Sequence, residues 1–251
     1  MANVSIVNWG SYLHPVEAHG ARIKHQVGVV EYTSPLLPPG TNIYTWQSEG
    51  RFQDIRMQGA LPILRGNHTY QLIGKLEAIP ENSAYFRVAT YDHENQFIKE
   101  FILEGSGGTF DYPVTARRYN ISLVVKANQL VRFKWLAIGL ANELADVKLE
   151  VSDDLRISAV LADKPQGFNI YVTKKGASSW LVPVQADSSQ AVIRLTDDEI
   201  ENGDTTSFAL LDQVFKKYDL THYQTRIRAY GYPLTSVVQA FQERLSRLKG
   251  E

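Results

Sequence analysis

Two stretches near the middle of the chain decide the fold: Tyr119–Lys126, which reads Y-N-I-S-L-V-V-K, and Val131–Trp135, which reads V-R-F-K-W. Apolar and polar side chains alternate in both, which is the spacing that places successive side chains on opposite faces of a strand. The same period recurs from Val4 to about Val151, with turn signals such as Gly66-Asn67 between the runs. Many short strands joined by turns predict an antiparallel β-sandwich, of jelly-roll type.

The pattern changes after Asp153-Asp154, where strand-like runs begin to alternate with helical ones. Thr196–Glu199 has the form of a capping box, which predicts the start of a short helix. A second helix is expected from Thr206 or Ser207, and a third after Pro233, with Leu234, Val237, Phe241 and Leu245 on one face. We therefore expect residues 1–152 to form the β-sandwich and residues 153–251 to form a smaller α/β domain.

The composition excludes several classes of function. Among the 251 residues there is no cysteine, so thiolate metal sites and disulfides are excluded. The net charge is −1 and no basic cluster stands out, so nucleic acid is not an expected partner. Met1–Trp9 lacks the features of a signal peptide, and the apolar run Trp135–Ala141 is too short to span a bilayer. We expect any membrane contact to be peripheral.

No catalytic motif stands out. Gly105–Gly108 lacks the lysine of a phosphate-binding loop, and the region around Ser178 lacks the second glycine of a nucleophile elbow. The six histidines have no metal-ligand spacing. The acidic cluster from Asp197 to Asp204 does not fit a calcium loop, and helix capping explains it better. We predict no catalytic residue, no metal and no cofactor.

The segment Ser34–Phe52 has the chemistry of recognition, because it holds prolines, glycine and aromatic residues but no histidine, cysteine or acid pair. Its prolines and Gly40 stiffen a turn ahead of an aromatic strand. The candidate binding residues are Tyr44, Trp46, Gln47, Arg51 and Phe52. An indole at position 46 could stack on a sugar or a partner side chain, but tryptophan in a sandwich strand is more often a core residue. Both readings stay open from the sequence.

Several blocks of sequence resemble a known family. They are Trp9-Gly10, Ser34–Thr41, Trp46–Ser48 with Phe52, Leu61–Leu64 with Gly66 and Thr69-Tyr70, Tyr85–Arg87 leading to Tyr91-Asp92, and Phe110–Pro113. In order and spacing they are similar to the smallest of the three accessory secretory proteins of the accessory Sec export system of Gram-positive bacteria. Asn95 stands where that family often has glycine. The residues from about Asp153 lie outside the resemblance.

The resemblance implies a non-catalytic, cytoplasmic subunit with a fold similar to carbohydrate-binding modules, held at the inner face of the membrane by its partners. Those partners are the two larger accessory secretory proteins, the accessory motor ATPase and serine-rich repeat adhesins, which the subunit helps to export as a scaffold or chaperone. The main alternative is a free-standing carbohydrate-binding module that uses Tyr44, Trp46 and Gln47. An enzyme is a third and weaker hypothesis, since no nucleophile or acid pair stands out.

Overall fold

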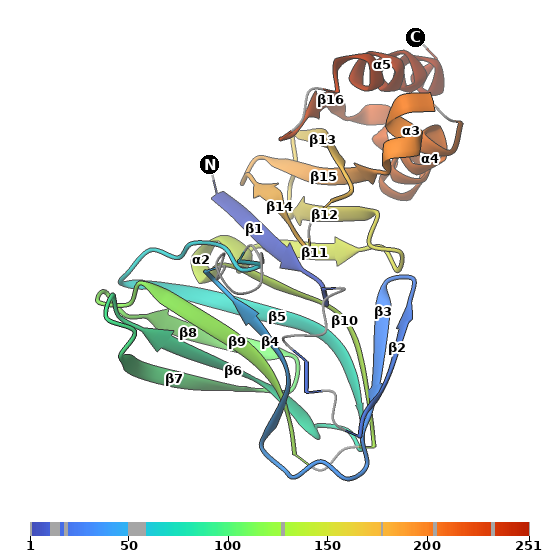
Figure 1. Ribbon diagram of the computed structural model, residues 1–251. Helices are drawn as coiled ribbons and strands as arrows, with labels where there is room; N and C mark the ends of the chain where they lie inside the picture. Colours follow the sequence, from blue (N-terminus) through green and yellow to red (C-terminus); the bar gives the residue numbers. More distant parts are fainter. Residues whose placement is uncertain are drawn as a thin grey trace. The chain divides into compact units, whose positions relative to one another are not determined.

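The computed structural model describes residues 2–10, 16–17, 20–49, 59–126, 129–176, 178–202, 205–231 and 234–250. The described chain is mostly β-strand, as expected (Figure 1). It divides into two compact units. The first comprises Val4–Leu144 and Ser178–Leu181, and the second comprises Met1–Asn3, Ala145–Ala177 and Val182–Glu251. Each unit is considered by itself.

Two antiparallel sheets build the first unit. Its elements are β1 (Ala2–Val7), β2 (Arg22–Gln26), β3 (Val29–Thr33), β4 (Thr41–Gln47), β5 (His68–Ile79), β6 (Ala84–Tyr91), β7 (Phe97–Glu104), β8 (Gly107–Tyr112), β9 (Arg118–Val125), β10 (Leu130–Leu140) and α2 (Ala141–Leu144). One sheet runs in the order β14-β1-β10-β3-β2, where β14 is Ser179–Val184, with β5 paired to β10 and β8. The other is four-stranded, in the order β4-β9-β6-β7.

The two sheets enclose one core, because alternate residues of each turn toward the other. In β6, Phe86 and Val88 are buried while Tyr85 and Arg87 lie on the opposite face. The sheets approach each other closely at Gly74 of β5. A Cβ atom there would lie 2.3 Å from Cε2 of the Phe86 ring, so only glycine fits at this point without a shift. The predicted alternation thus becomes a two-layered core.

A β-bulge changes the predicted pattern in β10. Val131 and Phe133 point into the core as expected, but the register against β5 shifts between Phe133 and Trp135. Beyond the bulge, Leu136 and Ile138 belong to the hydrophobic core of the first unit, whereas Trp135 does not. The prediction that Trp135 shares a face with Phe133 is therefore wrong, because one extra residue in a strand reverses the faces of all that follow.

The second unit combines a five-stranded sheet with helices. Its elements are β11 (Val147–Val151), β12 (Ile157–Ala162), β13 (Gly167–Lys174), β15 (Ser188–Leu195), α3 (Asp197–Asn202), α4 (Thr205–Tyr218), the 3₁₀ helix η1 (Leu220–His222), β16 (Gln224–Ala229) and α5 (Thr235–Lys249). The sheet order is β11-β12-β15-β13-β16. β13 is parallel to both β15 and β16, while β11, β12 and β15 pair antiparallel.

The helices cover one face of this sheet. Buried residues of α4 and α5, including Leu211 and Phe241, pack with Ile170 and Ile193 of the central strands. The capping box is confirmed, since the backbone N–H of Thr196 donates to Glu199 Oε2 (2.8 Å). α5 begins at Thr235, and Pro233 lies outside the described residues.

The division between the units differs from the predicted boundary at residues 152 and 153. β11 pairs with β12, and Ala145–Ala177 belong to the second unit. In addition, Ser178–Leu181 belong to the first unit, where β14 lies beside β1. The sequence pattern missed both features because the strand period does not identify a strand's partner. The jelly-roll topology stays a prediction.

Candidate binding face of the four-stranded sheet

The proline turn of the Ser34–Phe52 segment aims β4 into the core. Gly40 adopts a left-handed conformation (φ 87°), and its N–H donates to the carbonyl of Val125 (2.7 Å). Thr41 Oγ1 donates a hydrogen bond to the carbonyl of Pro38 (2.7 Å), which closes the turn. The turn is thus attached to β9, and β4 enters the four-stranded sheet in a fixed register against it.

Tyr44 and Trp46 lie inside the first unit, with 3% and 2% of their surface exposed. The Trp46 ring centroid lies 4.6 Å from that of Tyr44 and 5.1 Å from that of Phe133. Trp46 Nε1 donates to the carbonyl of Asn8 (2.9 Å), so the polar atom of the indole is satisfied within the protein. The reading of Trp46 as a core residue is therefore correct, and stacking of its indole on a ligand does not fit this burial.

Tyr44 serves a structural role of the same kind. Its hydroxyl accepts a hydrogen bond from the N–H of Gly10 (3.0 Å), and its ring lies 4.4 Å from the Trp9 ring, centroid to centroid. Burial raises the pKa of the Tyr44 hydroxyl, and the Gly10 hydrogen bond partly opposes that rise. Of the remaining candidates, Gln47 is exposed, while Arg51 and Phe52 lie outside the described residues.

Gln47 belongs to the opposite face of the sheet, which we call the outer face. Strand pairing places Gln47 beside Asn120 of β9, and the next level holds Thr45, Ser122 of β9 and Arg87 of β6. The outer face is defined here by Gln47, Tyr85, Arg87, Tyr91, Ile102, Arg118 and Asn120. The sequence reasoning missed all of these except Gln47, although they are the polar half of the same alternating strands. Only the register across four strands brings them together.

Internal contacts hold the outer face in shape. Arg87 Nη2 donates to Asn42 Oδ1 (2.8 Å), and the hydroxyls of Thr45 and Ser122 lie 3.0 Å apart. This bond and the flanking strands explain why Ser122 is buried, where alternation predicts an exposed serine. The fixed side chains reduce the entropy that a partner must overcome on binding.

Cations already cover the tyrosine rings of this face. The Arg118 guanidinium lies 4.6 Å from the Tyr91 ring centroid, and Lys126 Nζ lies 5.5 Å from that of Tyr85. A sugar that stacked on either ring would have to displace them.

The edge of the outer face carries two exposed apolar side chains together with the exposed carboxylates of Glu100 and Glu104. On β7, Ile102 and Phe97 are about half exposed, at 55% and 57%. Ile102 pairs with Arg87, and Phe97 pairs with Tyr91. Exposed apolar side chains beside arginine and tyrosine are the composition of protein–protein contact sites. The geometry suits contact with a protein better than it suits sugar stacking.

The structure gives little sign of acid–base or metal chemistry where it describes the chain. Over the described ranges, no group of three or more His, Asp or Glu side chains is placed to hold a metal ion. The strongest rises in pKa belong to buried tyrosines, such as Tyr112, whose burial raises its pKa to about 12. In the acidic cluster, Glu199 is bound by Thr196 and by Arg156, as its capping role requires.

In the part of the chain that the structure describes, no helix is long and apolar enough to cross a membrane.

Comparison with known proteins finds relatives of the first unit. Residues 17–139 match the model of accessory secretory protein 3 of the accessory Sec secretory system. The chain is 27% identical over 132 residues to the accessory Sec system protein of the same name from Staphylococcus aureus, an alignment that covers 53% of this chain. It spans only 41% of that relative's length.

Two solved structures share the fold. One is the crystal structure of accessory secretory proteins 1, 2 and 3 of Streptococcus pneumoniae, with 25% identity and a TM-score of 0.51, covering 53% of this chain and 94% of the matched chain. The other is the Glycosylation Associate Protein (Gap123) complex of Streptococcus agalactiae, with 19% identity and a TM-score of 0.54, covering 96% of this chain and 75% of the matched chain. Residues 17–139 match the family of accessory secretory protein 3, and this match together with the Staphylococcus aureus relative supports an accessory Sec system protein.

Proposed function

We propose that this protein is a non-catalytic subunit of an accessory Sec machinery. In this role it assembles with the two larger accessory secretory proteins and helps to export serine-rich repeat glycoprotein adhesins, as scaffold or chaperone. The observation that carries the proposal is the family match over residues 17–139, which covers most of the first unit. Similar folds occur in the structure of accessory secretory proteins 1, 2 and 3 and in the Gap123 complex.

The outer face supplies a physical means of assembly. It combines Arg87 and Tyr91, residue types that contribute strongly to protein interfaces, with the exposed apolar side chains of Ile102 and Phe97. We propose that a partner subunit packs across this face, burying Ile102 and adding hydrogen bonds to Gln47 and Asn120. The proposed location is cytoplasmic, at the inner face of the membrane through the partners, which include the accessory motor ATPase.

The alternative is a free-standing carbohydrate-binding module. Its main argument was stacking of a sugar on Trp46, and this argument is lost because Trp46 lies in the core. Its remaining basis is the set of amides and tyrosines on the outer face. Titration with GlcNAc-containing glycans tests it, followed by chemical shifts of the outer-face amides. Saturable shifts centred on Gln47 and Asn120 would support sugar binding, and unchanged spectra at millimolar sugar would remove the alternative.

A deletion experiment tests the proposed function in the native organism. Removal of the gene should leave serine-rich repeat adhesin inside the cell and reduce it at the surface, while proteins of the general export route stay unaffected. Re-expression of the full chain should restore the adhesin. Normal adhesin display in the deletion strain would contradict the proposal.

A further inference from the structure

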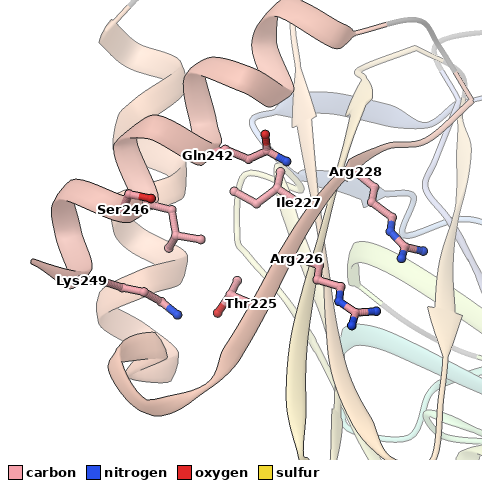
Figure 2. Close-up of a pocket in the computed structure, with 8 residues that line it drawn as sticks. Thr225, Arg226, Ile227, Arg228, Gln242, Ser246 and Lys249 are labelled. Carbon is pink, nitrogen blue, oxygen red and sulfur yellow. The ribbon is translucent and has the colours of Figure 1, made fainter. Parts of the chain in front are cut away.

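The sheet of the second unit has a free edge beside its last helix. In the described part of the chain, β16 pairs only with β13, so its other side carries no strand. A cavity of about 370 Å³ lies between β16 and α5 (Figure 2). On the helix side it is lined by Gln242, Leu245, Ser246 and Lys249, and on the strand side by Thr225, Arg226, Ile227 and Arg228, of which Ile227 and Leu245 are buried. This volume is in the range of pockets that hold ligands.

The two faces of β16 differ in chemistry. Thr225 and Ile227 pair with Phe168 and Ile170, which face the helices, and Figure 2 shows both side chains directed toward α5. Arg226 and Arg228 point the other way, away from α5. A strand placed beside β16 would therefore meet a groove on one face and two arginines on the other, at alternate positions.

The backbone at this edge is available for pairing. The N–H of Tyr230 donates to the carbonyl of Val172 in β13 (2.9 Å), so the even-numbered residues direct their peptide groups inward. By alternation, Thr225, Ile227 and Ala229 direct theirs to the free edge. The carbonyl of Tyr223, just before the strand, is already bonded there by Lys249 Nζ (2.7 Å). The available donors and acceptors thus begin at Thr225.

Charge decides which kind of strand suits this edge. No carboxylate lines the cavity, and neither Arg226 nor Arg228 forms an ion pair with any described residue. Two copies of the chain joined edge to edge would place these arginines beside those of the other copy, which is repulsive. An acidic strand would instead gain attraction at the same positions.

We propose that β16 and α5 form a docking groove for an extended acidic segment of a partner protein, which adds to the sheet as a further strand. Acidic side chains at every second position face Arg226 and Arg228. Small or apolar side chains at the intervening positions enter the groove over Ile227 and Leu245. The inference is independent of the function proposed above, because the groove lies outside residues 17–139.

The test uses the full chain and two fluorescent peptides of equal composition. One alternates, Glu-Val-Glu-Thr-Glu-Val-Glu-Thr, and the other has its four glutamates in a block. Fluorescence anisotropy should show the alternating peptide binding at least about 10-fold more tightly, because only it places every carboxylate on the arginine face. Arg226→Glu with Arg228→Glu should abolish this preference and favour a peptide in which lysine replaces each glutamate.

A second variant separates the groove from simple charge attraction. Ser246→Trp fills the groove without a change in charge and should weaken the alternating peptide by at least about 10-fold. Arg247→Glu is the matched control, because Arg247 is on α5 but does not line the cavity. It should stay within about 2-fold of the unmodified protein. Circular dichroism melts verify folding, and Arg226→Gln with Arg228→Gln replaces the charge reversal if that variant unfolds.

Three results would overturn the proposal. Equal affinity for the two peptides would show that the groove does not distinguish alternating from blocked glutamates, so the peptide does not bind as a strand in a fixed register. Binding of a single-stranded DNA oligonucleotide as tightly as the alternating peptide would indicate general attraction of anions. Self-association of the chain that Ser246→Trp removes would identify a second copy as the occupant.

Discussion

Trp46 Nε1 donates a hydrogen bond to the carbonyl of Asn8 across 2.9 Å. The bond links β4 of the four-stranded sheet to the residue that follows β1 of the other sheet, so the indole joins the two layers of the first unit. A residue that fits a recognition motif by sequence is thus a structural link. If the Ser34–Phe52 segment binds a partner, it does so through the outer face, which carries Gln47.

Trp46→Ala should therefore destabilise the first unit by about 3–5 kcal/mol, because it leaves a cavity in the aromatic core. Trp46→Phe keeps much of the packing but leaves the Asn8 carbonyl without its donor, at a cost of about 1–3 kcal/mol. Urea unfolding followed by circular dichroism measures both, with Gln47→Ala as an exposed control that changes stability by less than about 0.5 kcal/mol. Unchanged stability in Trp46→Ala would contradict the core assignment.

Gly74→Ala should destabilise the same unit by about 1–3 kcal/mol, because its new methyl group would meet the Phe86 ring 2.3 Å away. Phe86→Leu in the same chain should recover part of that loss by making room. The matched control is Gly108→Ala in β8, where an added Cβ meets Leu103 at an ordinary 3.5 Å. Thermal melting compares the variants, and equal effects at positions 74 and 108 would argue against the close approach of the sheets.

Glu150 should make the second unit sensitive to acid. Lys148 and Lys217 bind its carboxylate at 2.7 and 2.8 Å and lower its pKa from 4.5 to about 2. Because the folded pKa lies below the unfolded one, this stabilisation is complete above about pH 4.5 and is lost as the pH falls toward 2.

Glu150→Gln should therefore lower the unfolding free energy at pH 7 by about 1–2 kcal/mol, less than the full pKa shift implies because water screens the pair. The deficit relative to the unmodified protein should shrink below pH 4.5 and vanish only as the pH falls below about 2. Urea titrations across this range measure it, with Glu243→Gln on α5 as an exposed control. A deficit of the same size at every pH would show that the ion pairs are not its cause.

Ile102→Asp should weaken assembly with the partner subunits without unfolding the protein. The side chain is 55% exposed at the edge of the outer face, so a charge there costs little in the free protein but much in an apolar contact. We expect at least about a 10-fold loss of affinity, measured by biolayer interferometry. Ile63→Asp is the control, since Ile63 is 93% exposed outside the strands of that face. Equal losses from both variants would place the contact elsewhere.

The sequence predicted individual strands and helices well, but it predicted poorly which strands pair with each other. Alternation in Tyr119–Val125 and Val131–Phe133 predicted strands that the structure confirms, and the Thr196–Glu199 capping box marked a true helix start. Alternation could not locate the bulge after Phe133, because the extra residue is recognised only against β5. It also grouped Val147–Val151 with the first unit, although this strand pairs with β12 of the second, because a strand's period does not name its neighbour.

The site was predicted least well, for a physical reason. Trp46 and Gln47 are adjacent in the sequence but point to opposite faces of β4, so a motif that contains both cannot say which face binds. Arg87, Ile102 and Asn120 lie on three other strands, and only the pairing of β6, β7 and β9 brings them together. A binding face of this kind depends on register, which single-sequence patterns do not contain.

Affinity capture from the native cell tests whether the protein assembles with the two larger accessory secretory proteins. The full chain carries a C-terminal tag and is expressed from its own locus, and the captured proteins are identified by mass. We predict that the two larger accessory secretory proteins are recovered with it in comparable molar amounts, and that Ile102→Asp reduces their recovery while Ile63→Asp does not. Recovery of a folded tagged chain without either of these proteins would contradict the account.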